Sequence, residues 1–314
     1  MSNTIAFFTE MPFRGKVSRT HDNMRVEFAW MCALNADHYN YKDTPDQQYD
    51  LGIIIIPKKN PEFDIEEIRH YCKEVAVMQE GPHWYFQDYA LDKQVWYYNT
   101  LRAADIIFTH NRSDKKYYEG LTNHHDVRVL PSLMIEDAVG QLQEVDREGI
   151  IVGGNFVNWY GGFDSYIVAS GEFDKVYAPS MGRRQPGEEQ LLTHLPYMSW
   201  KEWIHKLNEF KYAIHLMRTH AAGTFALNCA YLGIPCIGYK GLDTQETCHP
   251  YTTIKIGDLS EARNILHKLK EDESFYQHCS KTAKLTYKEF YNENKFNTTF
   301  KLSLIHISEP TRRS

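Results

Sequence analysis

A segment around residue 220 has the residue types that bind anions at the start of a helix. The apolar run 212–217 is short enough to be a strand of a parallel sheet, and Arg218 follows it directly. Small residues at 221–223 (Ala-Ala-Gly) let a ligand approach the backbone, and Thr224 can cap a helix over 225–232. Because the first N–H groups of a helix bind anions, we expect an anion site at Thr224. The ligand that we expect there is the diphosphate of a nucleotide-activated substrate.

Three arginines are candidates for gripping this diphosphate, which needs positive charge where it leaves. Arg183 and Arg184 lie in a loop with glycine and proline on both sides, so their guanidinium groups can reach inward. Arg218 lies at the end of its strand, directly before the small-residue turn. One guanidinium group can donate to two phosphate oxygens at once, which favours this role. Exposed arginines, and a strand–turn–helix without a ligand, are the alternatives.

Glu80 is the first candidate for a general base. It ends a buried strand, and Gly-Pro at 81–82 fixes the turn after it. A carboxylate held in this way can take the proton of an attacking hydroxyl group. The alternative is a carboxylate that caps the following helix or forms an ion pair. His21 and Asp22, in the loop after the first strand, are the second candidates, although such a histidine also suits a solvated loop.

The first half of the chain also contains residues that suit an acceptor. A basic rim is expected from Arg14, Lys16, Arg19, Lys58 and Lys59, which could contact the phosphates of DNA. Five such charges are also found on any ordinary protein surface. The aromatic stretch that begins at His83 and Trp84 could stack on sugars or on extruded bases, although its spacing also suits a core.

These candidates follow strands of an expected α/β fold, since strands separated by helices with short links are typical of parallel sheets. Residues 1–135 are expected to form one Rossmann-like domain, with strands over 4–9, 50–56, 73–78, 104–110 and 127–130. Residues 136–148 lose periodicity and gain acids, as in a linker. Residues 149–301 are expected to form a second such domain that ends in a long helix. Ligands of these sheets gather at the carboxyl ends of the strands.

The segment 217–239 resembles the donor half of GT-B glycosyltransferases, whose signature is a small-residue turn, a helix, then Gly-Ile-Pro and a strand. The resemblance extends, as a two-domain plan, over nearly the whole native chain. It implies two domains facing a cleft, the second binding a nucleotide sugar (a UDP-sugar) and the first an acceptor. Many members hold the donor ribose with a glutamate where this chain has Asn228. The expected donor-binding residues are Gly153, Gly154, Asn155, Arg183, Arg184, Arg218, Gly223, Thr224 and Asn228.

A second resemblance concerns phage DNA glucosyltransferases, which act on hydroxymethylcytosine. The run Gly153-Gly154-Asn155-Phe156 resembles their donor-contacting Gly-Gly-Ser-Phe, but 157–160 lacks the arginines that follow there. Glu80 corresponds in order to their aspartate base. The resemblance implies a hydroxymethylated pyrimidine in DNA as acceptor. A surface glycan, a small molecule or a protein as acceptor, a sugar-nucleotide epimerase, and an inactive binding module stay open.

Composition limits the remaining classes. A net charge of −6 over 314 residues argues against a generally basic nucleic-acid binder, but not against a local basic groove. Six scattered cysteines read as buried thiols of a cytoplasmic protein, and no apolar run is long enough to span a membrane. The histidines are dispersed, and no DxD-type pair stands where a metal-dependent fold would need one. We therefore expect transfer without a metal and no cofactor besides the nucleotide sugar.

The last residues, 302–314, differ abruptly in style from the helix before them. They resemble the translated sequencing-adapter tails of proteins assembled from environmental DNA. We expect them to be non-native, and the source to be an uncultured microbe or a virus. If the source is a virus, the cytoplasm in which the protein is expected to act is that of the host.

Overall fold

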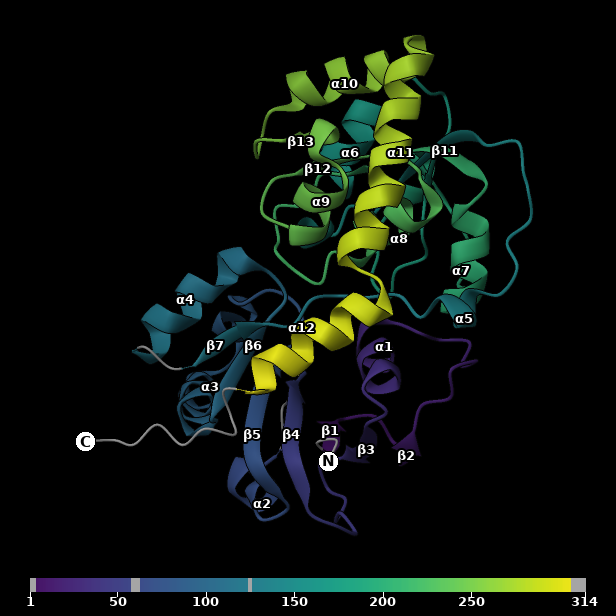
Figure 1. Cartoon of the computed structure of the whole chain (residues 1–314). Helices are drawn as coiled ribbons and strands as arrows, with labels where there is room; N and C mark the ends of the chain where they lie inside the picture. Colours follow the sequence, from purple (N-terminus) through teal and green to yellow (C-terminus); the bar gives the residue numbers. More distant parts are fainter. Residues whose placement is uncertain (1–3, 58–62, 124–125, 306–314) are drawn as a thin grey trace. The chain divides into compact units, whose positions relative to one another are not determined.

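The computed structural model describes residues 4–57, 63–123 and 126–305, which form two compact units (Figure 1). Within the described residues, the first unit comprises 4–19, 26–133 and 293–305. The second comprises 20–25 and 134–292. In the described part of the chain, no helix is long and apolar enough to cross a membrane.

The first unit is built on a seven-stranded sheet in the order β2-β3-β1-β4-β5-β6-β7. All its pairings are parallel except that of β2 with β3. The strands are β1 (Ile5–Thr9), β2 (Gly15–Lys16), β3 (Asp37–Asn40), β4 (Tyr49–Ile56), β5 (Cys72–Gln79), β6 (Ile106–Thr109) and β7 (Val127–Val129). The helices are α1 (Val26–Ala33), α2 (Ile65–Arg69), α3 (Leu91–Ala103), α4 (Arg112–Thr122) and α12 (Glu293–Ile305), with a 3₁₀ turn at Tyr85–Asp88.

The core of this unit follows from its apolar runs. The continuous run 53–56 is buried because β4 is a central strand with neighbours on both sides. The connection from β3 to β4 is a loop over residues 41–48, without the helix that usually joins parallel strands.

The second unit has a six-stranded, wholly parallel sheet in the order β10-β9-β8-β11-β12-β13. The strands are β8 (Glu148–Val152), β9 (Val176–Ala178), β10 (Leu192–His194), β11 (Phe210–His215), β12 (Cys236–Tyr239) and β13 (Thr253–Ile254). Its helices are α5 (Glu136–Val139), α6 (Gly162–Ala169), α7 (Trp200–Leu207), α8 (Thr224–Leu232), α9 (Asp243–Cys248), α10 (Leu259–Glu271) and α11 (Glu273–Phe290). 3₁₀ turns lie at Asn158–Tyr160, Glu188–Gln190 and Pro250–Thr252. Two α/β units with parallel sheets confirm the predicted fold class.

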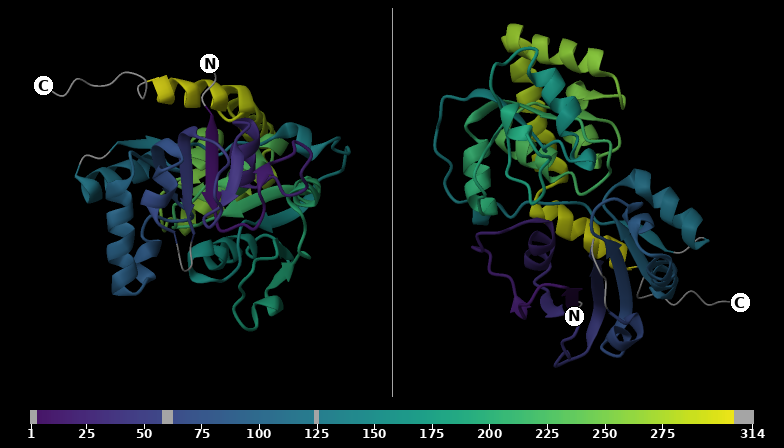
Figure 2. Two further views of the ribbon diagram at one scale, coloured as in Figure 1. Left: turned by 90° about the horizontal axis from the view of Figure 1, so that it is seen from below. Right: turned by 180° about the vertical axis from the view of Figure 1, so that it is seen from behind.

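The C-terminal helices differ from the expected single long helix. The chain leaves helical geometry at Tyr291, so α11 and α12 are separate helices. The sequence-based boundaries place residues 293–301 in the second domain, but α12 packs with the first unit. Its Phe296 and Phe300 are buried, and the Phe300 ring lies 6.1 Å from that of Phe108 on β6. Figure 2 shows this helix, in yellow, from two further sides.

All six cysteines are buried thiols, as the sequence predicts. Burial also governs several histidines. In the second unit, His249 joins two elements: its Nδ1 accepts from the Cys236 N–H at 3.3 Å, and its Nε2 lies 2.9 Å from the Ala226 carbonyl oxygen. Burial lowers the pKa of His249 from its ordinary value of 6.5 to about 4. The folded protein therefore holds this ring neutral at pH 5, while the unfolded chain protonates it.

This difference predicts a pH dependence of stability. The contribution of neutral His249 is complete above pH 6.5 and is lost as the pH falls from 6.5 to about 4. Over that window we expect the free energy of unfolding to fall by about 1.4 kcal/mol per pH unit for this one residue. Urea unfolding of the unsubstituted protein and of His249→Gln at pH 7, 6 and 5 measures it. Equal slopes for the two proteins would contradict the assignment.

Candidate functional site

The carboxyl edge of the second sheet brings together residues that are far apart in the sequence. Strands β8 and β11 are neighbours, so the segment 153–155 and Arg218 follow their ends at the same edge. Helix α8 starts at Thr224, and its N-cap is Gly223 with a φ of +66°. The prediction that Thr224 caps this helix is wrong, because Thr224 is already the first helical residue and no described side chain caps this end. Helix α6 starts at Gly162, whose N–H donates to the Asn155 carbonyl oxygen at 3.0 Å. Two helix N-termini, each able to bind an anion, thus lie at this edge.

The glycines of this edge are needed for packing. A Cβ added at Gly153 would lie 2.5 Å from the His215 ring, and one at Gly154 would lie 2.4 Å from the Tyr160 carbonyl oxygen. Burial lowers the pKa of His215 to about 4, so the ring that fills this space is neutral. The Gly-Gly run therefore permits close contact within the unit, whether or not a ligand approaches it.

Arg218 is the best-supported cation at this edge. Its Nη2 lies 3.1 Å from Asp164 Oδ2, in the first turn of α6, and Tyr239 donates to the same oxygen at 2.9 Å. The hydrogen bond and charge of Asp164 raise the pKa of Arg218. The Arg218 side chain is nevertheless 64% exposed. Asp164 thus orients a guanidinium group that solvent can still reach.

Arg183 and Arg184 lie in an exposed loop that is tied to the β8–α6 connection. The Asn155 side-chain amide donates to the Arg183 carbonyl oxygen. The Arg183 guanidinium lies 5.5 Å from the centre of the Trp159 ring, and Arg184 Nη2 lies 3.3 Å from Ser180 Oγ. The loop is therefore held beside the residues that follow β8.

Two of the expected donor ligands have structural roles. Asn155 is fully buried, and its Oδ1 accepts from the Val157 N–H at 3.1 Å. Asn228 is 4% exposed; in the orientation that satisfies both polar atoms, it donates to the Thr224 carbonyl oxygen at 3.2 Å and accepts from Trp203 Nε1 at 3.1 Å. Both polar atoms of Asn228 therefore have partners inside the unit, and its donor-binding role stays a prediction.

In the first unit, Glu80 follows β5 at the carboxyl edge of the sheet, half-buried. Its charge helps to raise the pKa of two tyrosines, Tyr41 and Tyr89, whose pKa burial already raises. The pKa of Tyr41 is raised mainly by burial, with further contributions from the charges of Glu10 and Glu80. Burial raises the pKa of Tyr89 to about 12, and Glu80 adds to this. Glu80 therefore lies among groups that stay protonated.

A second proton-transfer candidate lies close to it in sequence. His83 Nδ1 is 3.2 Å from Asp114 Oδ1, and Asp114 is only 6% exposed. Asn111 Nδ2 donates to the other Asp114 oxygen at 3.2 Å, and the Tyr117 ring centre lies 4.2 Å from that of His83. A carboxylate on one ring nitrogen orients the other for proton transfer. The sequence predicts only acceptor binding for His83 and gives no role to Asp114, although Asp114 follows the end of the next strand.

His21 and Asp22, the second candidates for the base, belong to the second unit and not to the first, where the sequence places them. The loop 20–25 packs with the second unit, where the Lys201 N–H of α7 donates to the Asp22 carbonyl oxygen at 3.0 Å. His21 Nδ1 accepts from the Asn23 N–H at 3.0 Å, and both side chains are exposed. The assignment to the first domain is wrong because this loop leaves that domain's fold.

The expected basic rim is largely engaged in local contacts. Arg14 forms an ion pair with Asp46, and Lys16 donates to the Asn35 carbonyl oxygen at 3.1 Å. Arg19 binds both carboxylate oxygens of Glu293, at 2.8 and 2.7 Å. Lys58 and Lys59 lie outside the described residues, and Trp84 is half-buried. Among the described residues of the rim, the ion pairs of Arg14 and Arg19 offset two of the positive charges.

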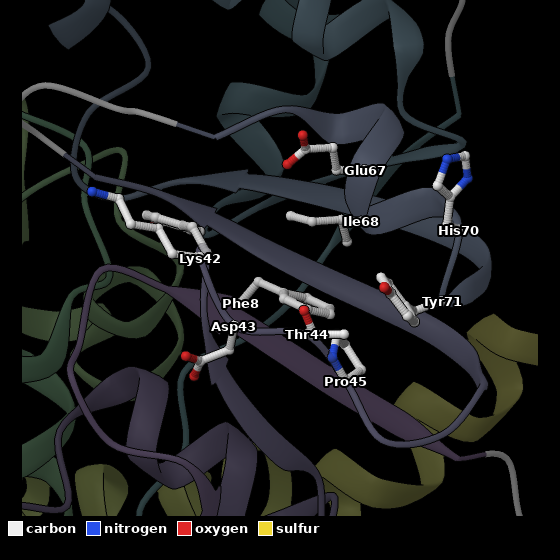
Figure 3. Close-up of a pocket in the computed structure, with 10 residues that line it drawn as sticks. Phe8, Lys42, Asp43, Thr44, Pro45, Glu67, Ile68, His70 and Tyr71 are labelled. Carbon is white, nitrogen blue, oxygen red and sulfur yellow. The ribbon is translucent and has the colours of Figure 1, made fainter.

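A hollow of about 350 Å³ opens in the first unit between the β3–β4 loop and α2 (Figure 3). Phe8 and Tyr71 contribute aromatic rings to it, and Asp43, Glu67 and His70 contribute polar groups. Residues 41–45 of the helix-free connection between β3 and β4 form one side of it. No residue expected from the sequence to form the site is among its described lining residues. Nor do three metal-ligating side chains gather anywhere in the described ranges.

No protein-family model matches this chain, and no curated protein matches it in sequence. Solved structures do. Sucrose-phosphate synthase from Thermosynechococcus elongatus is similar with a TM-score of 0.67 at 11% identity, over 97% of this chain and 99% of that chain. Anabaena Alr3699/HepE in complex with UDP and glucose gives 0.63 at 10% identity, over 97% and 100%.

A third similar structure is an alpha-glucosyltransferase in complex with UDP-glucose and DNA containing an abasic site. It gives a TM-score of 0.64 at 12% identity, over 95% of this chain and 98% of that chain. Identities this low show a shared fold and leave the activity open. With its two parallel sheets and its C-terminal helices, the chain has the GT-B fold.

Proposed function

We propose that this protein is a glycosyltransferase that moves a sugar from a nucleotide diphosphate sugar, a UDP-sugar, to a hydroxyl group of an acceptor. The observation that carries the proposal is the edge of the second sheet where exposed Arg218 and the N-termini of α6 and α8 come together. Breaking a sugar–diphosphate bond requires positive charge at the leaving group. Two structures of the same fold, solved with UDP and glucose and with UDP-glucose and DNA, support it.

In the proposed reaction, the second unit holds the donor. The diphosphate oxygens accept from the first N–H groups of α8 at Thr224 and from the guanidinium groups of Arg218 and Arg183. As the bond from the anomeric carbon to the diphosphate breaks, negative charge develops on the leaving diphosphate, and these groups stabilise it. Because guanidinium and backbone N–H groups supply the positive charge that the leaving group requires, the proposed transfer needs no metal ion.

The first unit supplies the proton acceptor. The acceptor hydroxyl oxygen forms the new bond to the anomeric carbon, and its proton passes to Glu80, or to His83 held by Asp114. Substitutions of these side chains decide between the two bases.

For the acceptor we propose a hydroxymethylated pyrimidine in DNA. The alpha-glucosyltransferase complexed with DNA supports this choice through its fold. The ion pairs of Arg14 and Arg19 weigh against a strong phosphate-binding rim, so a glycan or a small molecule is the second candidate. Incubation of the protein with a nucleotide sugar and hydroxymethylated duplex DNA at low salt tests it, with the mass of the DNA as the readout. No mass increase would remove DNA as the acceptor.

The first experiment is a thermal-shift panel of nucleotide sugars and UDP. A ligand at one hundred times its dissociation constant adds about 2.7 kcal/mol to the free energy of unfolding. We expect Arg218→Ala to remove most of this stabilisation, because Asp164 orients that guanidinium group at the anion site. Lys211→Ala is the control. Lys211 is a cation at the start of β11, far from the carboxyl edge of the sheet, and forms an ion pair with Glu273. If no member of the panel shifts the unfolding of the unsubstituted protein, the proposal fails.

A further inference from the structure

A buried glutamate follows the loop 181–187 of the second unit, the arginine loop, which carries Arg183 and Arg184. Glu188 is only 2% exposed, in the 3₁₀ turn that follows this loop. Glutamate is almost never fully buried unless its charge is paired. The contacts of Glu188 therefore indicate what the burial achieves.

One carboxylate of this residue joins three segments. Glu188 Oε2 accepts from the Phe156 N–H, in the connection after β8, and from the Gln185 N–H, next to the arginines, both at 3.1 Å. Oε1 lies 3.1 Å from His194 Nε2 on β10, whose side chain is 6% exposed. Glu188 thereby fixes the arginine loop to the β8–α6 connection.

Asn155 makes a second link between the same two segments. Its amide donates to the Arg183 carbonyl oxygen, while its Oδ1 accepts from the Val157 N–H. The Arg183 guanidinium lies over the Trp159 ring, on the same connection. Two buried polar side chains, one of them charged, thus hold the backbone from which Arg183 extends.

We propose that Glu188 is a positioning residue for the donor: its carboxylate holds the loop 181–187 so that Arg183 can bind the diphosphate. The inference rests on the proposed function. We assign Glu188 no contact with the donor, because it is buried and both of its oxygens face groups inside the unit. The Phe156 and Gln185 N–H groups stabilise this carboxylate inside the protein, and the His194 ring packs against its other oxygen. Burial is the largest of the effects that lower the pKa of His194, and Arg184 adds to it.

Replacing Glu188 with alanine is expected to free the loop and to weaken UDP binding about tenfold, as loss of a residue that supports a ligand-contacting group commonly does. Titration calorimetry with UDP measures the dissociation constant. Glu188→Gln keeps one acceptor oxygen for the two N–H groups and should restore part of the affinity. Glu189→Ala removes the exposed neighbouring carboxylate and should change nothing.

A loop released from its contacts is also cut faster by trypsin. In the unliganded protein, cleavage after Arg183 or Arg184, read by mass, should accelerate in Glu188→Ala and stay unchanged in Glu189→Ala. This measurement needs no nucleotide. Unchanged cleavage in Glu188→Ala would overturn the claim that the carboxylate holds the loop.

A double-mutant cycle separates positioning from general destabilisation. If Glu188 acts through Arg183, Glu188→Ala should cost little further affinity once Arg183→Ala is present, whereas with Arg218→Ala the two losses should add. Additive losses with Arg183→Ala would overturn the proposal while leaving the glycosyltransferase function intact. Absence of UDP binding by the unsubstituted protein would overturn both.

Discussion

Glu80→Gln is expected to lower the rate of sugar transfer by about 10²–10⁴-fold while leaving the affinity for UDP unchanged. Glutamine has nearly the same shape as glutamate but cannot take the proton of the acceptor hydroxyl. UDP affinity should be preserved because the groups proposed to bind it lie in the second unit, whereas Glu80 belongs to the first. The rate is measured with the nucleotide sugar selected by thermal shift, and the affinity by calorimetry.

His83→Gln and Asp114→Asn are the matched comparison, because His83 lies three residues from Glu80 and is held by a buried carboxylate. If Glu80 is the base, both variants should keep most of the rate. If instead the rate falls in His83→Gln and Asp114→Asn but not in Glu80→Gln, the imidazole takes the proton and the assignment to Glu80 is wrong.

The residues at strand ends were the most predictable part of the site. Arg218 and the segment 153–155 are over sixty residues apart, yet the alternation of strands and helices predicts a parallel sheet, whose strands end at one edge. The turn before α8 was equally readable, because glycine, threonine and a following apolar run mark a helix start. Local sequence patterns are therefore enough to predict which residues follow strand ends and where a helix begins.

What escaped prediction depends on contacts between distant segments. Asn228 lies on α8 as expected, but its side-chain oxygen accepts a hydrogen bond from the indole of Trp203 on α7. Glu188 looks like an ordinary acidic loop residue until Phe156 and His194 are placed around it. The same holds for Asp114, whose importance comes from His83. Burial of a charged side chain is a tertiary property that no local sequence pattern reports.

The C-terminal region shows the same limit at the level of units. The sequence predicts a long helix at the end of the second domain, and the region is helical in α11 and α12. Which unit a helix joins depends instead on where its apolar face finds a partner. For α12 that partner is Phe108 of the first unit, more than 180 residues earlier in the chain.

Gly223→Ala is expected to lower the free energy of unfolding by about 1–3 kcal/mol and to weaken UDP binding more than tenfold. Gly223 precedes α8 with a φ of +66°, where L-residues are strained. An added Cβ would also lie 2.1 Å from Thr244 Oγ1, which donates to the Gly223 carbonyl oxygen at 2.8 Å. Relief of that clash must move either Thr244 or the first turn of α8, whose N–H groups we propose to bind the diphosphate.

Gly149→Ala separates the two causes, because Gly149 has nearly the same φ, +67°, in the same unit but open space around its Cβ position. It should show the conformational cost alone and keep UDP affinity. Urea unfolding and calorimetry of both variants supply the comparison. If Gly223→Ala binds UDP as tightly as Gly149→Ala, the start of α8 does not hold the diphosphate, and the donor would have to be bound by the arginines without it.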